Sequence, residues 1–224
     1  LQAAIKKEMM AKKMPWHVAT VVTQIEVDKN DEAFENPRKP IGGYYGKEEA
    51  DALMAADPSL VVKEDAGRGY RRVVASPKPM DIVEKASIIN MLDNEFVVIA
   101  CGGGGVPVVS DGQGGYNGVP AVIDKDFATA KLADTVDAEY LFVLTAVDRV
   151  AVNFGRPDQR EIEKMTVAEA QEFCDQGHFA PGSMLPKVQA AMEFVQAKPG
   201  RRAVIASLEK AALAIKGESG TIIY

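Results

Sequence analysis

Cysteine is scarce in this 224-residue sequence, which contains only Cys101 and Cys174. Two cysteines cannot build a disulfide framework, and these two lack the paired spacing that is typical of a zinc site. We therefore expect a reducing, cytoplasmic compartment and no metal site formed by protein side chains.

A surplus of positive charge and a long apolar run are absent as well. The chain has 26 Lys and Arg against 32 Asp and Glu, a formal net charge of −6, which argues against nucleic acid or an anionic membrane as its partner. No apolar stretch approaches the roughly 18 residues that span a bilayer, and the first residues show no signal-peptide pattern. The length allows one domain with a smaller appendage.

An initiator Met is also missing, because the chain starts at Leu1 inside a predicted helix over residues 1–13 that Pro15 ends. We therefore expect that the 224 residues are not the whole gene product. The β-branched residues that follow predict a strand over residues 17–27.

Residues 28–76 interrupt this regular pattern, and we expect them to form a small subdomain that leaves the main sheet. The Ser-Pro-Lys-Pro stretch at residues 76–79 favours extended backbone and predicts the return linker. The expected parts are a polar Pro- and Gly-rich segment over 28–46, a short helix over 50–54, and strands at 60–63 and 70–75 around a turn at 65–69.

From residue 77 onward helices and strands alternate, which predicts an α/β fold with a mostly parallel sheet. The capping box Thr166 to Glu169 marks the start of one helix. The expected helices are one that carries Ile82, Ala86, Ile89 and Leu92, and others over 127–136, 166–177, 186–196 and 209–216; the expected strands are 96–101, buried on both faces, 140–145, 203–208 and 221–224.

Ligands of open parallel sheets bind beyond the carboxyl ends of the strands. The first such place holds the four glycines of residues 102–105, whose N–H groups can turn towards an anion. Pro107 stands where a dinucleotide fingerprint requires glycine. Because glycines are more often part of a flexible turn than of a site, both interpretations stay open.

The triplet Asp124-Lys125-Asp126 lies just before a predicted helix. A lysine there can act as a point charge on a transferring phosphoryl group, with an adjacent carboxylate to orient it. The alternative is a helix start in which Asp124 or Asp126 caps the first turn. The triplet alone does not decide between the two.

Two further segments could face a ligand. Asp148 follows the most hydrophobic strand, where it could accept a hydrogen bond from a ribose hydroxyl or start a turn. The Gly/Ser/Pro loop over residues 179–187 enters a helix whose free N–H groups favour phosphate. Lys187 in that first turn opposes the helix dipole, and this cost indicates an anionic ligand.

Other reactive residue types receive plainer interpretations. His17 and His178 have no evident nucleophile or ligand partner, so we interpret both as structural. The two cysteines are expected to pack as small hydrophobic residues, and the arginines of the predicted hairpin, Arg68, Arg71 and Arg72, to lie on a solvated face.

Taken in order, these motifs resemble the carbamate kinases of the amino acid kinase family. The resemblance spans essentially every residue, and its long ordered segments make chance agreement very unlikely. The segments that carry it are 36–42 (NPRKPIG), 63–70 (KEDAGRGY), 76–79 (SPKP), 102–107, 121–126, 144–148, 153–155, 178–184, 186–188 and 207–209.

The resemblance implies reversible phosphoryl transfer between ATP and carbamate, giving ADP and carbamoyl phosphate, with Mg2+ accompanying the nucleotide. In cells it implies ATP synthesis during the breakdown of arginine or related nitrogen compounds, by a cytoplasmic homodimer. The implied fold is a three-layer sandwich with a mostly parallel central sheet and a small protruding subdomain. Its implied parts are residues 1–27 as the remainder of a substrate-binding half, 28–76 as the subdomain, and 77–224 as the nucleotide-binding half.

The same resemblance implies roles for single residues. Lys125 matches the lysine that contacts the transferring phosphoryl group, and Asp126 matches the aspartate that organises the catalytic lysines. Lys187 matches the lysine on the nucleotide phosphates, and Lys39 the lysine that the subdomain lowers over the active site. The nucleotide cleft is matched by Thr145, Ala146, Val147, Asp148, Asn153 and Met184 together with Lys125, and the carbamate end by Gly102, Gly103 and Gly104.

The family pattern starts with a strand and a loop that carry a lysine and a Gly-Gly-Asn segment, followed by a Gly-Asn loop. None of this precedes Leu1. If the polypeptide begins there, we expect little or no kinase activity, and in a longer protein full activity. The alternative function is an inactive nucleotide-binding fragment or a regulatory module.

Overall fold

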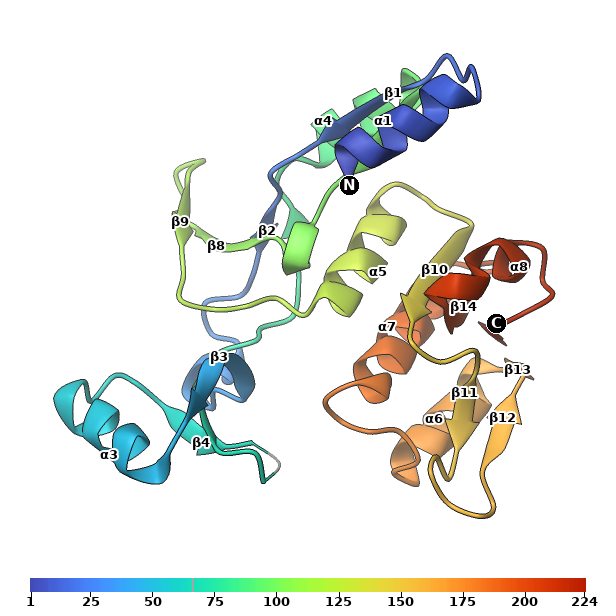
Figure 1. Cartoon of the computed structure of the whole chain (residues 1–224). Helices are drawn as coiled ribbons and strands as arrows, with labels where there is room; N and C mark the ends of the chain where they lie inside the picture. The colour runs from blue at the N-terminus through green and yellow to red at the C-terminus, as the bar shows by residue number, and fades with distance from the viewer. Residues whose placement is uncertain (66) are drawn as a thin grey trace.

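The computed structural model describes residues 1–65 and 67–224, so that Ala66 of the predicted turn lies outside the described residues. The chain has mixed α/β structure (Figure 1). Its helices are α1 (Gln2–Ala11), α2 (Glu32–Glu35), α3 (Lys47–Ala56), α4 (Lys85–Asp93), α5 (Lys125–Thr135), α6 (Val167–Asp175), α7 (Met184–Ala197) and α8 (Ala211–Ile215), with 3-10 turns η1 (Gly102–Gly104) and η2 (Leu208–Lys210). Among the described residues, every helix is too short or too polar to span a membrane.

The strands pair in several separate sheets, in the orders β1-β7, β6-β2-β8-β9, β3-β5-β4, β10-β14-β15-β13 and β11-β12. The pairs β1/β7, β2/β8, β10/β14 and β13/β15 are parallel, and the other pairs are antiparallel. The strands are β1 (His17–Thr20), β2 (Gln24–Glu26), β3 (Lys39–Tyr45), β4 (Val62–Glu64), β5 (Tyr70–Val74), β6 (Asp81–Ile82), β7 (Phe96–Ile99), β8 (Val106–Ser110), β9 (Tyr116–Gly118), β10 (Tyr140–Thr145), β11 (Val150–Val152), β12 (Arg160–Ile162), β13 (Lys164–Met165), β14 (Arg202–Ser207) and β15 (Thr221–Ile223).

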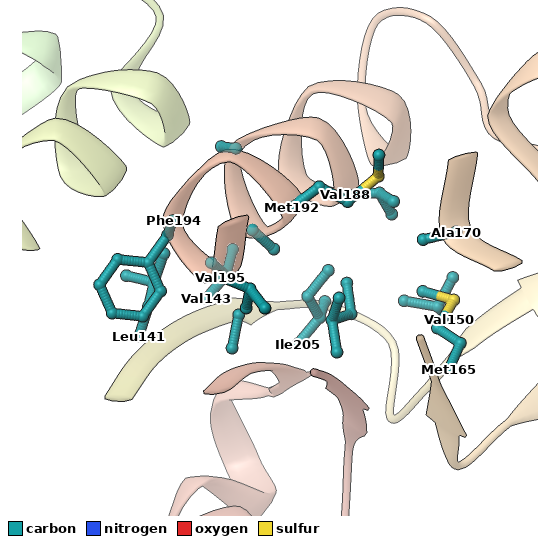
Figure 2. Packing of buried hydrophobic residues seen from close by; sticks show 14 of the residues in the cluster. Leu141, Val143, Val150, Met165, Ala170, Val188, Met192, Phe194, Val195 and Ile205 are labelled. Atoms are coloured by element: carbon teal, nitrogen blue, oxygen red, sulfur yellow. The ribbon is translucent and has the colours of Figure 1, made fainter. Parts of the chain in front are cut away.

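The largest hydrophobic core lies in the carboxyl-terminal half, where α7 packs on β14 and β10 and α5 packs on α7 (Figure 2). Ala190 and Ala191 are fully buried on α7 and allow it to approach the sheet closely, while Phe194 fills the space beside Leu141. Full burial of each large side chain, such as Ile205, contributes about 1.5–3 kcal/mol. This core fixes the position of both helices that carry predicted site residues.

Several elements of this half lie where the sequence predicts them. Strands β10 and β14 and helices α5 and α7 agree with the predicted elements to within a few residues. The predicted capping box is present, because the Thr166 side chain accepts from the Glu169 N–H and Glu169 accepts from the Thr166 N–H. Apolar periodicity and helix caps are local signals, and in this half they are sufficient to predict where the helices and strands lie.

The predicted strand over residues 17–27 is wrong as one element, because it is divided into β1 and β2 at Val21, Val22 and Thr23. β1 pairs with β7, whereas β2 pairs with β8 and β6. Thr23 explains the break, since its hydroxyl accepts from the Cys101 N–H and donates to the Val21 carbonyl. One run of β-branched residues therefore supplies two sheets.

Helix α4 and strand β7 also differ from the predictions. Ile82 belongs to β6 rather than to the helix, and within α4 the buried residue is Ile88, whereas the predicted Ile89 and Leu92 are exposed. β7 is half-buried along its length rather than buried on both faces. A parallel sheet of many strands would bury it, but β7 pairs only with β1 among the described residues.

Residues 28–76 form the sheet β3-β5-β4 with α3 beside it, and they project from the rest of the chain at the lower left of Figure 1. β4 and β5 pair antiparallel, as the predicted hairpin requires. β3 was not predicted, because its sequence KPIGGYY contains one Pro and two Gly. Residues 76–80 have no regular structure, which agrees with the expected linker.

Candidate functional site

Helix α5 begins with the triplet Asp124-Lys125-Asp126. Asp124 is its N-cap, and the Asp124 carboxylate accepts from the Asp126 backbone N–H at 2.9 Å. The capping interpretation of the triplet is therefore right for Asp124. Asp126 stands in the first turn with its residue only 6% exposed, and a carboxylate buried to that extent requires a partner.

The partner of Asp126 is Lys187, in the first turn of α7. The Lys187 Nζ donates to both carboxylate oxygens of Asp126, at 2.9 and 3.2 Å, and its side chain is 12% exposed. The Lys125 Nζ lies 3.5 Å from the same carboxylate with a mostly exposed side chain. Two lysines from two helices thus meet at one aspartate, where they can serve a negatively charged group.

A third lysine reaches the start of α5 from the projecting region. The Lys39 Nζ, on β3, donates to the Asp124 Oδ2 at 2.7 Å. Burial alone would raise the pKa of Asp124, but the Lys39 ammonium and the Asp126 N–H outweigh it and hold that pKa below its ordinary value. Lys39, Lys125 and Lys187 are therefore gathered around two carboxylates two residues apart.

The glycine loop lies against the same place and has two parts. A Cβ on Gly104 would lie 2.2 Å from the Ile123 carbonyl oxygen, and a Cβ on Gly105 would lie 2.5 Å from Ile25. Gly104 thus permits close packing against Ile123, which precedes Asp124, and Gly105 permits close packing against Ile25 of β2. Gly102 and Gly103, in contrast, are exposed with open space beside them. The loop therefore supports the start of α5 with one part and leaves the other free.

Cys101, at the start of this loop, is a packing residue. Burial raises the pKa of its thiol to about 11, so the thiol stays protonated near neutral pH. Both cysteines are free.

A cavity of about 290 Å³ opens beside Lys187. Five of the predicted nucleotide-binding residues line it: Thr145, Ala146, Val147, Met184 and Lys187. The other lining residues are Arg149, Ala151, Phe154, His178, Phe179, Ala180 and Ser183. The lining is mainly apolar, with Lys187 and Arg149 as its cationic groups, which suits a flat ring system joined to an anionic tail.

Three predicted nucleotide-binding residues, Lys125, Asp148 and Asn153, do not line this cavity. Lys125 stands at the start of α5, beside Asp126. Asp148 forms an ion pair with Lys210, and hydrogen bonds from Lys210 and Ser207 lower the pKa of Asp148. Asn153 has a left-handed backbone, with φ of 53°, and its Nδ2 donates to Asp158 at 2.7 Å. The Asp148 carboxylate thus binds residues at and beyond the end of β14, and Asn153 is engaged within its own loop.

A second cavity of about 630 Å³ lies between residues 28–76 and the starts of α5 and α7. Lys39 and Asp124 line it. Arg68 and Arg71 line it as well, each paired with Asp65. Arg68 and Arg72 are exposed, as predicted, but the Arg71 side chain is only 22% exposed, so the prediction of a solvated face is wrong for Arg71. The loop before α7 separates the two cavities, because its residues line both.

Sequence reasoning missed His178, Phe154 and Arg149 as cavity residues. His178 combines a structural and a lining position, because its ring packs edge-on against Phe173 while it borders the 290 Å³ cavity. A usable signal existed for Arg149, which directly follows Asp148 beyond the end of a strand. Phe154 lies after β11, a strand too short to stand out in the sequence.

Among residues 1–65 and 67–224, no group of three or more His, Cys, Asp or Glu side chains is placed to hold a metal ion. Asp126 is occupied by lysines instead.

Comparison with known proteins gives this geometry its context. Residues 46–207 match the family model described as "Amino acid kinase family". The chain is 56% identical to a carbamate kinase of Clostridium perfringens over 223 residues, which cover 100% of this chain and 70% of that protein. The chain belongs to the carbamate kinases of the amino acid kinase family. These enzymes are phosphotransferases.

Other members of the amino acid kinase family agree with this assignment. Carbamate kinase 1 of Enterococcus faecium is 51% identical over 209 residues, covering 93% of this chain and 66% of that protein. The structure of a Giardia lamblia carbamate kinase bound to AMP-PNP superposes with a TM-score of 0.89 at 44% identity, covering 99% of this chain and 70% of that one. The chain thus spans about two thirds of the length of these relatives.

Proposed function

We propose that this chain transfers a phosphoryl group reversibly between ATP and carbamate, with formation of ATP from carbamoyl phosphate and ADP as its main direction. The observation that carries the proposal is the convergence of Lys187 and Lys125 on Asp126, between two cavities. Such a cluster can neutralise a phosphoryl group that passes from one cavity to the other.

In the ATP-forming direction, an oxygen of the ADP β-phosphate attacks the phosphorus of carbamoyl phosphate, and the bond from phosphorus to the carbamate oxygen breaks. Carbamate leaves with that bonding pair, so no covalent enzyme intermediate is required. Lys125, whose side chain is 63% exposed, is free to contact the transferring group, and Lys187 holds the nucleotide phosphates. Asp126 keeps both ammonium groups in place, since positioning and charge neutralisation dominate phosphoryl transfer.

The nucleotide occupies the 290 Å³ cavity in this proposal, with its base against the apolar lining and its phosphates at Lys187. Mg2+ enters with ADP or ATP as part of the substrate, because it prefers phosphate oxygens and water to an all-protein cage. Asp148 and Asn153 border the nucleotide through their loops. Gly102 to Gly104 and Lys39 face the carbamoyl phosphate end.

The proposal also covers the division of the chain into parts, its compartment and its oligomeric state. Residues 1–27, 28–76 and 77–224 act as the remainder of a substrate-binding half, a protruding subdomain and a nucleotide-binding half. The parallel pairs β1/β7, β2/β8 and β10/β14 lie in three separate sheets, and their parallel direction supports the proposal of a three-layer sandwich with a mostly parallel central layer. Two free cysteines suit the reducing cytoplasm, and the exposed apolar side chains of Leu1 and Met10 on and beside α1 suit a homodimer that works in arginine or related catabolism.

A coupled assay tests the activity. Purified chain, ADP with Mg2+ and carbamoyl phosphate should produce ATP at a rate proportional to protein concentration, and hexokinase with glucose-6-phosphate dehydrogenase would report it. Turnover of acetyl phosphate at a comparable rate would move the substrate to another acyl phosphate. Binding of ADP by calorimetry without any turnover would favour a nucleotide-binding module instead.

A further inference from the structure

The Asp124 carboxylate contacts two parts of the molecule with its two oxygens. Its Oδ1 accepts from the Asp126 N–H at 2.9 Å and so fixes the first turn of α5. Its Oδ2 accepts from the Lys39 Nζ at 2.7 Å, across 85 residues of sequence. The side chain of Asp124 is 14% exposed and that of Lys39 is 36% exposed, so the pair is closed on the protein side and open towards the 630 Å³ cavity.

A backbone contact joins the same two parts. The Val122 N–H donates to the Ala75 carbonyl at 3.0 Å, and Ala75 and Ala121 form an isolated parallel bridge. Residues 121–124 therefore contact residues 28–76 twice, through Ala75 at the end of the excursion and through Lys39 on β3. Without the ion pair, the contact that remains between residues 121–124 and the described part of residues 28–76 is the one through Ala75.

We propose that Asp124 is a positioning residue that sets the position of residues 28–76 relative to the first turn of α5, which carries Lys125 and Asp126. This rests on the proposed function, in which Lys39 meets the phosphoryl group. Asp124 holds the Lys39 ammonium at the edge of the cavity, next to the first turn that carries Lys125. A phosphoryl oxygen that enters the cavity competes with the Asp124 Oδ2 for the same ammonium, so that β3 is redirected by exchange of one anionic partner for another.

The variant Asp124→Asn separates the two contacts. Asn caps helices about as well as Asp, so the start of α5 is kept while the charge on the Lys39 side is removed. We expect backbone amides of residues 39–45 to exchange about two- to fivefold faster in hydrogen-exchange mass spectrometry, the range expected for a partly exposed ion pair. We expect kcat to fall roughly ten- to hundredfold, as for a misplaced group, with little change in the KM for ADP.

Asp81→Asn is a matched control. The Asp81 carboxylate also accepts from a backbone N–H, that of Ile82, and from a lysine, Lys85. Lys85 is only four residues away in sequence, so this pair joins no distant parts. The control should leave the exchange of residues 39–45 and the value of kcat unchanged.

Lys39→Met tests the pair from its other side and does not touch the cap of α5. It should raise the exchange of residues 39–45 to the same level as Asp124→Asn, and the double variant should add nothing further. The proposal is overturned if Asp124→Asn leaves that exchange at the wild-type level, or if the two single effects simply add. The exchange readout needs no turnover, so a chain without kinase activity would contradict the proposed function and leave this test intact.

Discussion

The two regions that meet at the start of α5 are built differently. Lys187 stands on α7, which packs into the large hydrophobic core with α5, β10 and β14. Lys39 stands on a three-stranded sheet whose buried side chains include Val62 and Val73 but which contributes none to the three hydrophobic cores. Lys187 is thus held in place by the packing of α7 in the core, whereas Lys39 is held mainly by its ion pair with Asp124.

This difference indicates how the site divides its tasks. Groups that bind the nucleotide lie on elements whose displacement would disrupt a close-packed core. The group that approaches the transferring phosphoryl moiety lies on a region that can shift at low cost, because few buried contacts oppose its motion. The following changes test that division, beginning with the largest expected effect.

Asp126→Ala should have the largest effect, a loss of unfolding free energy in the region that packs in the large core. It leaves the Lys187 ammonium buried without a counter-charge, and removal of one partner of a buried pair costs about 3–5 kcal/mol of unfolding free energy. Urea denaturation followed by circular dichroism measures it. Asp148→Ala, which breaks the exposed pair with Lys210, is the control and should have a far smaller effect. Equal losses would show that the Asp126 pair is not buried in solution.

Lys125→Ala and Lys187→Ala should separate transfer from binding. Removal of Lys125 should lower kcat by about 10²–10³-fold, as for the loss of one transition-state donor, while calorimetry finds ADP binding nearly unchanged. Removal of Lys187 should weaken ADP binding about ten- to hundredfold, since hydrogen bonds to charged groups are worth about 1.5–3 kcal/mol. If both variants turned over like the parent chain, the site assignment would be wrong.

Gly104→Ala should show whether the glycine loop supports the core side of the site. With φ of +118° and the Ile123 carbonyl in the way, an alanine there requires the backbone before Asp124 to shift, at a cost of about 1–3 kcal/mol. The Tm of thermal unfolding and the value of kcat should both fall. Gly102→Ala is the matched control for the Tm, because nothing lies within 4 Å of its added Cβ. Similar behaviour of the two variants would contradict this role.

The smallest expected effect concerns the contact between Asp124 and Lys39, and it is a change in folding stability that occurs only at acidic pH. The pKa of Asp124 is lowered in the folded chain, so its stabilising contribution is complete above the ordinary Asp pKa of about 3.9 and is lost as pH falls through the lowered folded value. The stability difference between the wild-type chain and Asp124→Asn should therefore be constant from pH 7 to pH 5 and shrink below pH 4. Urea titrations across this range measure it, and a difference that grows in acid would contradict the assignment.

The sequence predicts the carboxyl-terminal half well because its signals there are local. The strand at residues 140–145, the capping box at Thr166 and the helix that begins near Lys187 each follow from neighbouring residues. The same kind of signal fails where pairing decides the structure. Residues 17–27 read as one strand, and only the contact between Thr23 and Cys101 shows why they are two.

The candidate site divides in the same way. The triplet at residues 124–126 and the position of Lys187 could be recognised from spacing at strand ends and helix starts. The pairing of Lys187 with Asp126 and of Lys39 with Asp124 could not, because 61 and 85 residues separate the partners. Arg71 was expected on a solvated face for the same reason, since nothing local indicates that β5 borders a cavity.

The order of the triplet has a consequence for insertions and deletions. Asp124, Lys125 and Asp126 are consecutive, yet their side chains address β3, open solvent and α7 in turn. Asp124 is the N-cap with extended backbone (ψ of 124°), and Lys125 and Asp126 start the helix, so one residue added between Asp124 and Lys125 would move the Asp124 carboxylate away from the Asp126 N–H that it caps. Such a change should disrupt the cap of α5 and the Lys39 contact together, while the pair of Asp126 and Lys187 stays in place on two packed helices. The length of this junction is therefore as strict a requirement for the Asp124 contacts as its chemistry.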